Sequence, residues 1–172
     1  MDPCQVPGND QAADIERMMA LYGDSILRLC FLYLHDRALS EDAVQETFLR
    51  AFKSLCSFRG ECSEETWLVR IAVNCCKSIS RTAWFRHVDR SITLDILPEP
   101  SLSHDIKDDT VIVEVMRLPG KYREVILLYY YQGMRTKEIA ETLSLPQPTV
   151  SSRLKRAKNR LAKRLERWYF DE

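Results

Sequence analysis

Residues 135–165 read RTKEIAETLSLPQPTVSSRLKRAKNRLAKRL, and this stretch decides the fold of the C-terminal part of the chain. Its first half predicts a short helix that Thr136 caps. The residues of this helix that are expected to face inward are Ile139, Ala140 and Leu143. Residues 144–146 predict a turn, in which Ser144 stands where Gly is often found and costs little if its φ is negative.

A second, longer helix is expected to begin at about Gln147, with Pro148 tolerated in its first turn. Apolar residues at a spacing of three or four predict its buried side: Val150, Leu154, Ala157, Leu161 and Leu165. Two helices joined by so short a turn indicate a helix-turn-helix, whose second helix enters the major groove of DNA. The polar side chains available there for base edges and phosphates are Gln147, Thr149, Ser151, Ser152, Arg153, Lys155 and Arg156. A merely solvated basic face is the alternative, but the turn and the two buried sides together favour DNA binding.

The net charge is zero, from 25 Lys and Arg against 25 Asp and Glu, and taken alone this argues against a nucleic-acid binder. The charges are unevenly distributed, however. Residues 146–172 hold eight basic side chains against three acidic ones, whereas residues 1–56 hold nine acidic ones against five basic ones. The sequence therefore indicates an acidic front and a basic C-terminal part, which suit different partners.

The N-terminal half is predicted to be helical, with no strand pattern of any length. A first helix is expected over residues 12–34, with an apolar side of Ile15, Met18, Met19, Tyr22, Ile26, Leu29, Cys30, Tyr33 and Leu34. Ser40 is expected to cap the next helix, whose apolar side holds Ala43, Val44, Thr47, Phe48, Ala51 and Phe52. After a loop at residues 56–62, Ser63 opens a third helix with a buried side of Trp67, Leu68, Ile71, Ala72, Cys75 and Ile79.

The helical pattern fails from Asp89 to about Asp109, where Pro98 and Pro100 and their polar neighbours predict a linker. Helices resume over residues 110–118 and 119–132, and Gly133 predicts the end of the second. We therefore expect an all-α protein of two small helical domains joined by a flexible linker, the second domain containing the helix-turn-helix. The expected limits are residues 10–88 for the first domain, 89–108 for the linker and 109–170 for the second domain.

No motif predicts an enzyme, a cofactor or a small-molecule substrate. The sequence contains no Gly-rich phosphate-binding loop, and its three histidines offer no catalytic triad. None of the six cysteines shows paired metal-ligand spacing, so we expect plain thiols and no metal site, with redox sensing as the alternative. The N-terminal segment has no signal-peptide pattern and no apolar run is long enough to span a bilayer, which predicts a cytoplasmic protein.

The third helix of the front half has a second, polar side made by Asn74, Lys77, Ser78 and Arg81. Arg70 and Arg86 extend its positive charge, and Trp84 and Phe85 follow directly. Basic residues interleaved with aromatic ones suit single-stranded nucleic acid, because phosphates pair with the cations and bases stack on the rings. Trp67 is instead expected in the core, since it lies on the apolar side.

Four segments together resemble the extracytoplasmic-function (ECF) sigma factors: DAVQETFLRAF (42–52), FRG followed by TWLVRIAVNCCKS (66–78), LPGKYREVILLYYYQGMRTKEIAETL, and TVSSRLKRAKNRL. The resemblance covers both helical blocks, in the order of that two-domain family. It implies a transcription initiation factor whose first domain binds core RNA polymerase and opens the −10 element of promoter DNA. The second domain would read the −35 element and dock on the polymerase flap.

Position by position, the resemblance also implies a set of contacts. Core polymerase would be bound by Asp42, Gln45, Glu46 and Leu49. The loop 56–65 would accept a flipped base, and the −10 strand would be lined by Asn74, Lys77, Ser78 and Arg81. The −35 contacts would fall on Thr149, Ser151, Ser152, Lys155 and Arg156. An anti-sigma factor, often membrane-bound in this family, is implied as a further partner.

Two other hypotheses stay open from the residues alone. The chain could be a stand-alone helix-turn-helix regulator whose front domain senses a ligand or dimerises, and failure to join core polymerase would favour that. It could also be a thiol-based redox or metal protein, which loss of function on replacing all six cysteines would favour.

Overall fold

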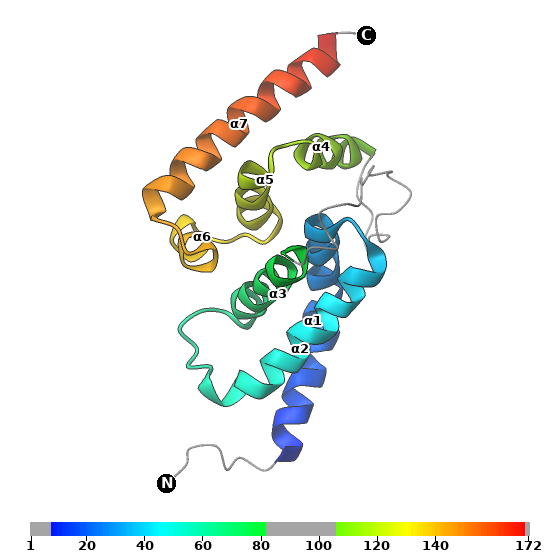
Figure 1. Cartoon of the computed structure of the whole chain (residues 1–172), viewed down its shortest axis with the longest axis vertical. Coiled ribbons are helices and arrows are strands. Elements are labelled where there is room, and N and C mark those ends of the chain that lie inside the picture. Colours follow the sequence, from blue (N-terminus) through cyan, green and yellow to red (C-terminus); the bar gives the residue numbers. More distant parts are fainter. Residues whose placement is uncertain (1–7, 82–105, 171–172) are drawn as a thin grey trace. The chain divides into compact units, whose positions relative to one another are not determined.

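The computed structural model describes the backbone of residues 8–81 and 106–170, and the side chains of residues 11–81 and 111–165. Every regular element in these ranges is helical, which confirms the all-α class (Figure 1). The chain divides into two compact units, Met1–Ile92 and Thr93–Glu172. The expected linker, 89–108, lies outside the described residues except for its last three positions, which belong to a helix.

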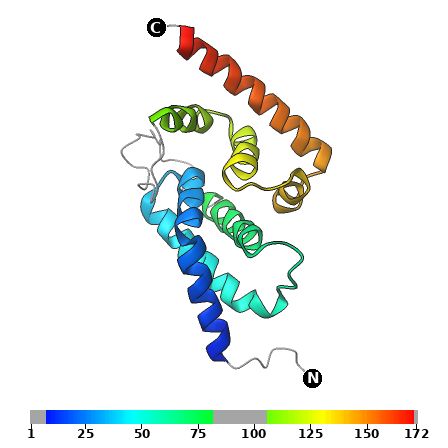
Figure 2. The same ribbon diagram turned by 180° about the vertical axis from the view of Figure 1, so that it is seen from behind.

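The first unit is a bundle of three helices, α1 (Gly8–Leu34), α2 (Arg37–Ser54) and α3 (Glu64–Ser80), each of which packs against the other two (Figures 1 and 2). A short 3-10 turn, η1 (Leu55–Ser57), continues α2. The largest fully buried side chains of this unit are Met18, Ile26, Leu29, Leu34, Leu68, Val69 and Val73. Most of the predicted apolar sides of the first and third helices meet in this core, which fixes which faces remain outside.

The cap of α2 is Asp36, so the expectation of Ser40 was wrong. Asp36 has an extended backbone, and its Oδ1 accepts a hydrogen bond from the backbone N–H of Leu39 at 3.0 Å. Ser40 is fully buried inside the helix, where its hydroxyl donates to the carbonyl oxygen of Asp36. Both residues are good cap formers, and the helix begins at the earlier one, which directly follows His35 with its positive φ of 56°.

Two residues predicted for the apolar sides are exposed. Met19 of α1 is 48% exposed and Phe52 of α2 is 39% exposed, so both expectations of burial were wrong. The opposite deviation occurs in α3, where Val69, Val73 and Cys76 are buried although they lie outside the predicted side. The physical reason is that α3 packs against α1 and α2 on adjoining sides, so its buried arc is wider than one stripe.

The second unit consists of α4 (Ile106–Met116), α5 (Gly120–Ile126), α6 (Thr136–Leu143) and α7 (Gln147–Phe170). The predicted helix 119–132 is α5 continued by a wider π-helical turn, η4 (Leu127–Tyr131), and Gly133 follows it with a φ of +61°. Helices α4, α5 and α6 all pack against α7. The long C-terminal helix therefore carries the contacts that hold this unit together.

The helix-turn-helix is formed by α6 and α7, with two local corrections. Thr136 is the first residue of α6 and not its cap; Glu138 instead accepts the backbone N–H of Arg135 at 2.8 Å. Ser144 has a φ of +54°, so the condition under which it would cost little is not met. Its turn closes with hydrogen bonds from Ser144 N–H to Glu141 O (3.2 Å) and from Leu145 N–H to Ala140 O (2.9 Å), which satisfy the last carbonyls of α6.

Candidate nucleic-acid and protein interfaces

The N-terminal half of α7 packs against the rest of its unit through one apolar side. Val150 and Ala157 are completely buried and Leu154 is 7% exposed, while Leu161 and Leu165 are half-buried further along. The predicted burial is therefore confirmed for Val150, Leu154 and Ala157, while Leu161 and Leu165 are only partly covered. Of the polar residues predicted to contact DNA, the exposed ones are Gln147, Ser151, Ser152, Lys155 and Arg156, and the half-buried ones are Thr149 and Arg153.

Arg153 differs from the other predicted DNA contacts because it is already engaged within its own unit. Its Nη1 lies 3.1 Å from Oε1 of Glu124 on α5, and the two side chains are only 24% and 19% exposed. This partly buried ion pair joins α5 to α7, and the loss of one partner would leave the other charge without its counterion. Its place as a DNA contact stays a prediction, while the structure gives it a packing role.

Aromatic rings lie under the basic side chains of α7. Arg156 donates a hydrogen bond to the hydroxyl of Tyr122, which lowers the pKa of that tyrosine below its usual value. The guanidinium of Arg160 lies 5.1 Å from the ring centre of Tyr122, and Nζ of Lys158 lies 5.3 Å from that of Tyr130. These cation–π contacts orient the basic side chains from below. The sequence reasoning missed the role of Tyr122, because only the folded chain brings it under α7.

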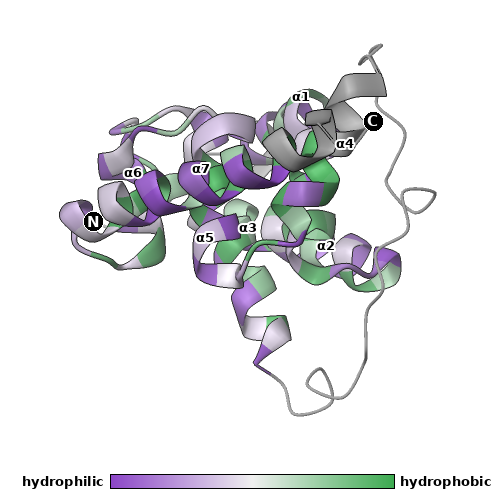
Figure 3. Cartoon of the chain, turned by 90° about the horizontal axis from the view of Figure 1, so that it is seen from above, coloured by the Kyte–Doolittle hydropathy of each residue, from purple (hydrophilic) through white to green (hydrophobic). Residues whose placement is uncertain are grey.

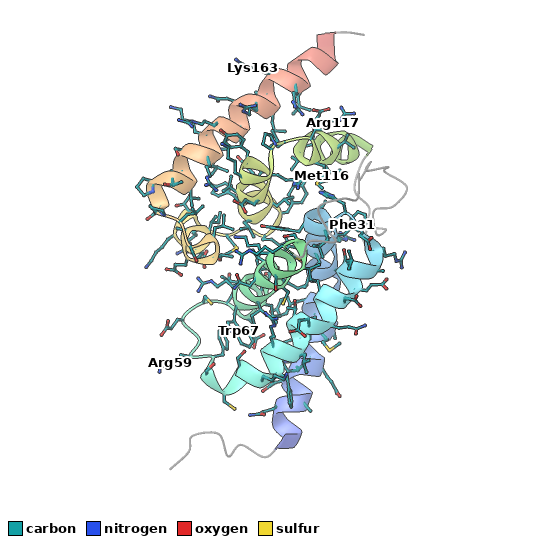
Figure 4. The ribbon with its side chains drawn as sticks, in the orientation of Figure 1. Phe31, Arg59, Trp67, Met116, Arg117 and Lys163 are labelled. Atoms are coloured by element: carbon teal, nitrogen blue, oxygen red, sulfur yellow. The ribbon has the colours of Figure 1, made fainter. Side chains whose placement is uncertain are left out.

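The basic surface continues along α7 beyond the helix-turn-helix. Figure 3 shows α7 as largely hydrophilic with hydrophobic bands, and Figure 4 shows Lys163 on the side of the helix away from α5. The exposed cations of this surface are Lys155, Arg156, Lys158, Arg160 and Lys163. Such a row suits an anionic backbone, because each phosphate contact releases condensed counterions.

The exposed side of α2 combines acid and apolar groups. Asp42 and Gln45 are exposed, and Leu49 is 48% exposed. Glu46 is half-buried and its Oε1 lies 2.6 Å from Nε of Arg50 one turn later. The structure thus brings the four predicted protein-contact residues onto one helix, with Phe52 exposed near its end. An apolar centre surrounded by polar groups is the usual arrangement of a protein–protein interface.

The predicted polar side of α3 lies opposite its buried arc. Asn74, Ser78 and Arg81 are exposed and Lys77 is half-buried, all on the C-terminal part of the helix or just after it. The loop before α3 is fixed at its base, where the rings of Phe58 and Trp67 stack with centroids 4.7 Å apart. Trp67 is half-buried, and Figure 4 shows Arg59 projecting from the loop away from it.

The start of α3 is also tied to α1. Both terminal nitrogens of Arg17 donate to the carboxylate of Glu64, at 2.9 and 2.7 Å. This hydrogen-bonded pair holds the pKa of Glu64 below its usual value and raises that of Arg17. Ser63 caps the helix, since its Oγ accepts the backbone N–H of Thr66 at 3.1 Å, as the sequence indicated.

The cysteines of the described residues are free thiols. Cys30, Cys75 and Cys76 are buried between the helices of the first unit. Burial raises the pKa of Cys75, and a hydrogen bond with Cys30 together with burial raises that of Cys76. The thiols of Cys75 and Cys76 are therefore neutral and poorly nucleophilic. Within residues 11–81 and 111–165 no three His, Cys, Asp or Glu side chains are grouped to hold a metal ion, and no helix there is long and apolar enough to cross a membrane.

Comparisons with known proteins match two separate stretches of the chain to two family models. Residues 18–86 match the family Sigma-70 region 2, and residues 111–161 match the family Sigma-70, region 4. The chain is 30% identical to the ECF RNA polymerase sigma factor SigW of Bacillus subtilis, over 94% of this chain and 93% of that protein. It is 29% identical to the RNA polymerase sigma-H factor of Pseudomonas aeruginosa, over 92% and 89% of the two chains.

A solved structure shows the same fold. The sigma factor RpoE of Bartonella quintana, in complex with the anti-sigma factor NepR, superposes with a TM-score of 0.73 at 24% identity, over 89% of this chain and 97% of that one. Neither a stand-alone regulator nor a thiol or metal protein is favoured by these findings. The chain belongs to the ECF family of RNA polymerase sigma factors, which initiate transcription at specific promoters.

Proposed function

We propose that this sigma factor divides its contacts among three helices: α2 binds core RNA polymerase, α3 with the loop before it reads the −10 element, and α7 reads the −35 element. The observation that carries the proposal is the separation of charge on well-packed helices. Asp42 and Leu49 lie exposed on α2, whereas the exposed groups along α7 are mainly cationic or neutral polar. No chemical step is assigned to any residue of the chain.

The contact with polymerase is supported by the chemistry of the α2 face. Asp42 is exposed and can pair with a basic partner surface, while Leu49 supplies apolar area at the centre of the contact. Gln45 and Glu46 flank them, and the Arg50 pair holds Glu46 in one orientation. We assign this face, Asp42, Gln45, Glu46 and Leu49, to core polymerase.

The contact with the −10 element is supported by the polar side of α3 and by the loop that precedes it. Asn74, Lys77, Ser78 and Arg81 follow one side of the helix and offer donors to a backbone and to base edges. Arg59 at the loop tip is exposed, and it directly follows Phe58, whose ring stacks on that of Trp67. We assign the helix side to the −10 strand and the loop to an unstacked base.

The contact with the −35 element is supported by the helix-turn-helix geometry of α6 and α7. The N-terminal half of α7 exposes small polar groups and two cations above its buried underside. We assign the −35 contacts to Gln147, Thr149, Ser151, Ser152, Arg153, Lys155 and Arg156. On this basis residues 10–88 form the core-binding and −10-binding domain, and residues 109–170 the −35-binding domain.

We also propose that an anti-sigma factor binds this chain. The support is that two structures with the same fold were solved as complexes: RpoE of Bartonella quintana with the anti-sigma factor NepR, and CnrH with the cytosolic domain of CnrY. Such a protein would keep the chain from polymerase by covering one of the faces assigned above. Its identity is a question for co-purification from the native organism.

The division of labour is tested by Asp42→Arg in the full chain. Reversal of this charge should weaken association with core polymerase by at least about tenfold, since it places two like charges in contact. Binding of a −35 duplex to the same variant should change little. Fluorescence anisotropy with labelled core polymerase and with labelled duplex measures both.

The matched control is Glu41→Arg, the same charge change at an exposed neighbour that pairs with Arg37 on another side of α2. It should weaken core association less than Asp42→Arg does. A larger loss of −35 binding than of core association in Asp42→Arg would reject the proposed division.

A further inference from the structure

The loop between α2 and α3 is held at both of its ends by α1. At the beginning of the loop, the side-chain amide of Gln11 contacts the thiol of Cys56. At its end, the guanidinium of Arg17 grips the carboxylate of Glu64, the first residue of α3, through two hydrogen bonds of 2.9 and 2.7 Å. Arg17 and Glu64 are 47 positions apart in the sequence, so this is a tertiary contact and not a feature of one helix.

The loop is also stiffened from within. Phe58 stacks on Trp67 one turn into α3, and Ser63 fixes the helix start through its cap. The chain turns back at Gly60, whose φ is +70°. Between the Phe58–Trp67 stack and the Ser63 cap lies the short tip of the loop, residues 59–61, which is exposed. The tip is thus a small segment held between two fixed ends.

The Arg17–Glu64 pair fixes the position of the loop end against α1, and it adds little to the stability of the unit. The two side chains are 45% and 30% exposed, and ion pairs in that environment add little to the free energy of unfolding. The two-pronged match of a guanidinium to a carboxylate does, however, fix both the direction and the distance of the groups that it joins. The hydrophobic core of the unit lies elsewhere, at residues such as Leu29, Leu68 and Val73.

We infer that Arg17, through Glu64, is a positioning residue for −10 recognition: it presets the loop 56–63 in the form that accepts an unstacked base. The inference rests on the proposed role of that loop in reading the −10 element. A loop that is not fixed in one form can rearrange around different bases, and binding surfaces that rearrange in this way discriminate less between ligands. Gln11 supports the same loop from its other end and is expected to have the smaller effect, because it makes one contact with a weak acceptor.

The test uses polymerase reconstituted with the full chain and two promoters that differ in one base of the −10 element. The measured quantity is the ratio of transcript yields from the two promoters. Arg17→Glu and Glu64→Arg should each reduce this ratio by about threefold or more, because each replaces an attraction by a repulsion at the loop base. The double variant Arg17→Glu/Glu64→Arg should return the ratio to within about twofold of the starting value, since it restores an ion pair with the charges exchanged.

Arg37→Glu is the matched control. It breaks an exposed Arg–Glu pair on α2, between Arg37 and Glu41, that does not touch the loop, so it should leave the ratio unchanged. Arg17→Lys keeps the charge but loses the two-pronged geometry, and it should lower the ratio partially without a shift in melting temperature. Hydrogen exchange gives a second readout: the amides of residues 58–63 should exchange faster in Arg17→Glu and in Arg17→Lys than in Arg37→Glu.

An unchanged ratio in Arg17→Glu, or an equal loss of yield from both promoters, would overturn the inference, and so would a double variant that fails to recover. A variant of the loop tip, Arg59→Ala/Glu61→Ala, separates this from failure of the proposed function. If the tip variant changes the ratio but Arg17→Glu does not, the positioning role is refuted while the loop keeps its assignment. If neither changes the ratio, the proposed role of the loop itself is refuted.

Discussion

Helices α3 and α7 are both assigned to promoter DNA, yet they are built in opposite ways. Helix α3 packs against two helices and is buried over a wide arc, from Leu68 and Val69 to Cys75 and Cys76, so only a narrow polar side remains. Helix α7 has a narrow buried underside at Val150, Leu154 and Ala157, and polar or basic groups occupy the rest of its surface.

The difference fits the two kinds of DNA that the helices are proposed to meet. A helix that enters the major groove of a duplex needs contacts to bases and to phosphates on both flanks, which requires a wide exposed arc. A single strand can be followed along one side of a helix, with the adjoining loop taking an extruded base. The narrow side of α3 and the wide side of α7 are in keeping with these requirements.

The largest effect expected from this comparison concerns the cores. Leu68→Ala removes a side chain that is completely buried in α3 and should lower the free energy of unfolding of the first unit by about 2–5 kcal/mol. Leu161→Ala removes a half-buried side chain of α7 and should cost the second unit less, below about 2 kcal/mol.

Hydrogen exchange measures each unit separately, which is needed because two units of one chain can unfold independently. Equal losses for Leu68→Ala and Leu161→Ala, or a larger loss in α7, would contradict the view that α3 is the more deeply packed of the two helices.

A second, smaller effect separates DNA contacts from packing contacts on α7. Arg156→Ala removes an exposed cation and should weaken binding to a −35 duplex by about 1–3 kcal/mol if it reads a base. Arg153→Ala instead leaves Glu124 partly buried without its partner, so its main effect should be a loss of stability in the second unit.

Titration with duplex DNA and thermal unfolding of the same variants distinguish the two roles. Tyr122→Phe extends the comparison, since it keeps the ring and removes only the hydroxyl that accepts from Arg156. It should reduce base discrimination by less than Arg156→Ala does. A full loss of affinity in Arg153→Ala at unchanged stability would show that DNA contact, and not packing against Glu124, is the main role of Arg153.

The same comparison explains how far the fold could be predicted. On α7 the buried side consists of a single row of apolar residues spaced three or four apart. The periodicity of the sequence therefore located Val150, Leu154 and Ala157 correctly. On α3 the stripe was only part of the buried arc, and Val69 and Val73 were missed because a second neighbouring helix cannot be read from the periodicity of one helix. Met19 and Phe52 show the reverse, since apolar residues remain at the surface where no neighbour covers them.

The candidate sites were predictable only where they are local. Residues on one helix, such as the set assigned to the −35 element, follow from sequence spacing, and their assignment stays a prediction. The partners that orient them do not follow, because Tyr122 under Arg156 and Arg17 on Glu64 are brought together by packing between separate helices. Sequence also could not choose between Asp36 and Ser40 as a cap, since both side chains can accept the same kind of hydrogen bond.

The smallest expected effect concerns the residues that lead into each DNA-facing helix. Helix α3 starts from Ser63, which has an extended backbone and a satisfied cap, whereas α7 follows a turn in which Ser144 has a φ of +54°. A non-glycine residue costs about 1–2 kcal/mol in the left-handed region. Ser144→Gly should therefore stabilise the second unit by up to about 1 kcal/mol, with part of the gain offset by the greater entropy of glycine in the unfolded chain.

Ser63→Ala should act in the opposite direction and destabilise the first unit by about 1 kcal/mol, because the N–H of Thr66 loses its acceptor. Thermal unfolding combined with hydrogen exchange of α3 and α7 measures both changes. A destabilised Ser144→Gly variant would mean that the serine contributes more to the turn than its backbone costs. The turn that leads into α7 would then be no weaker than the capped start of α3, and the contrast between the two helices would be confined to their packing.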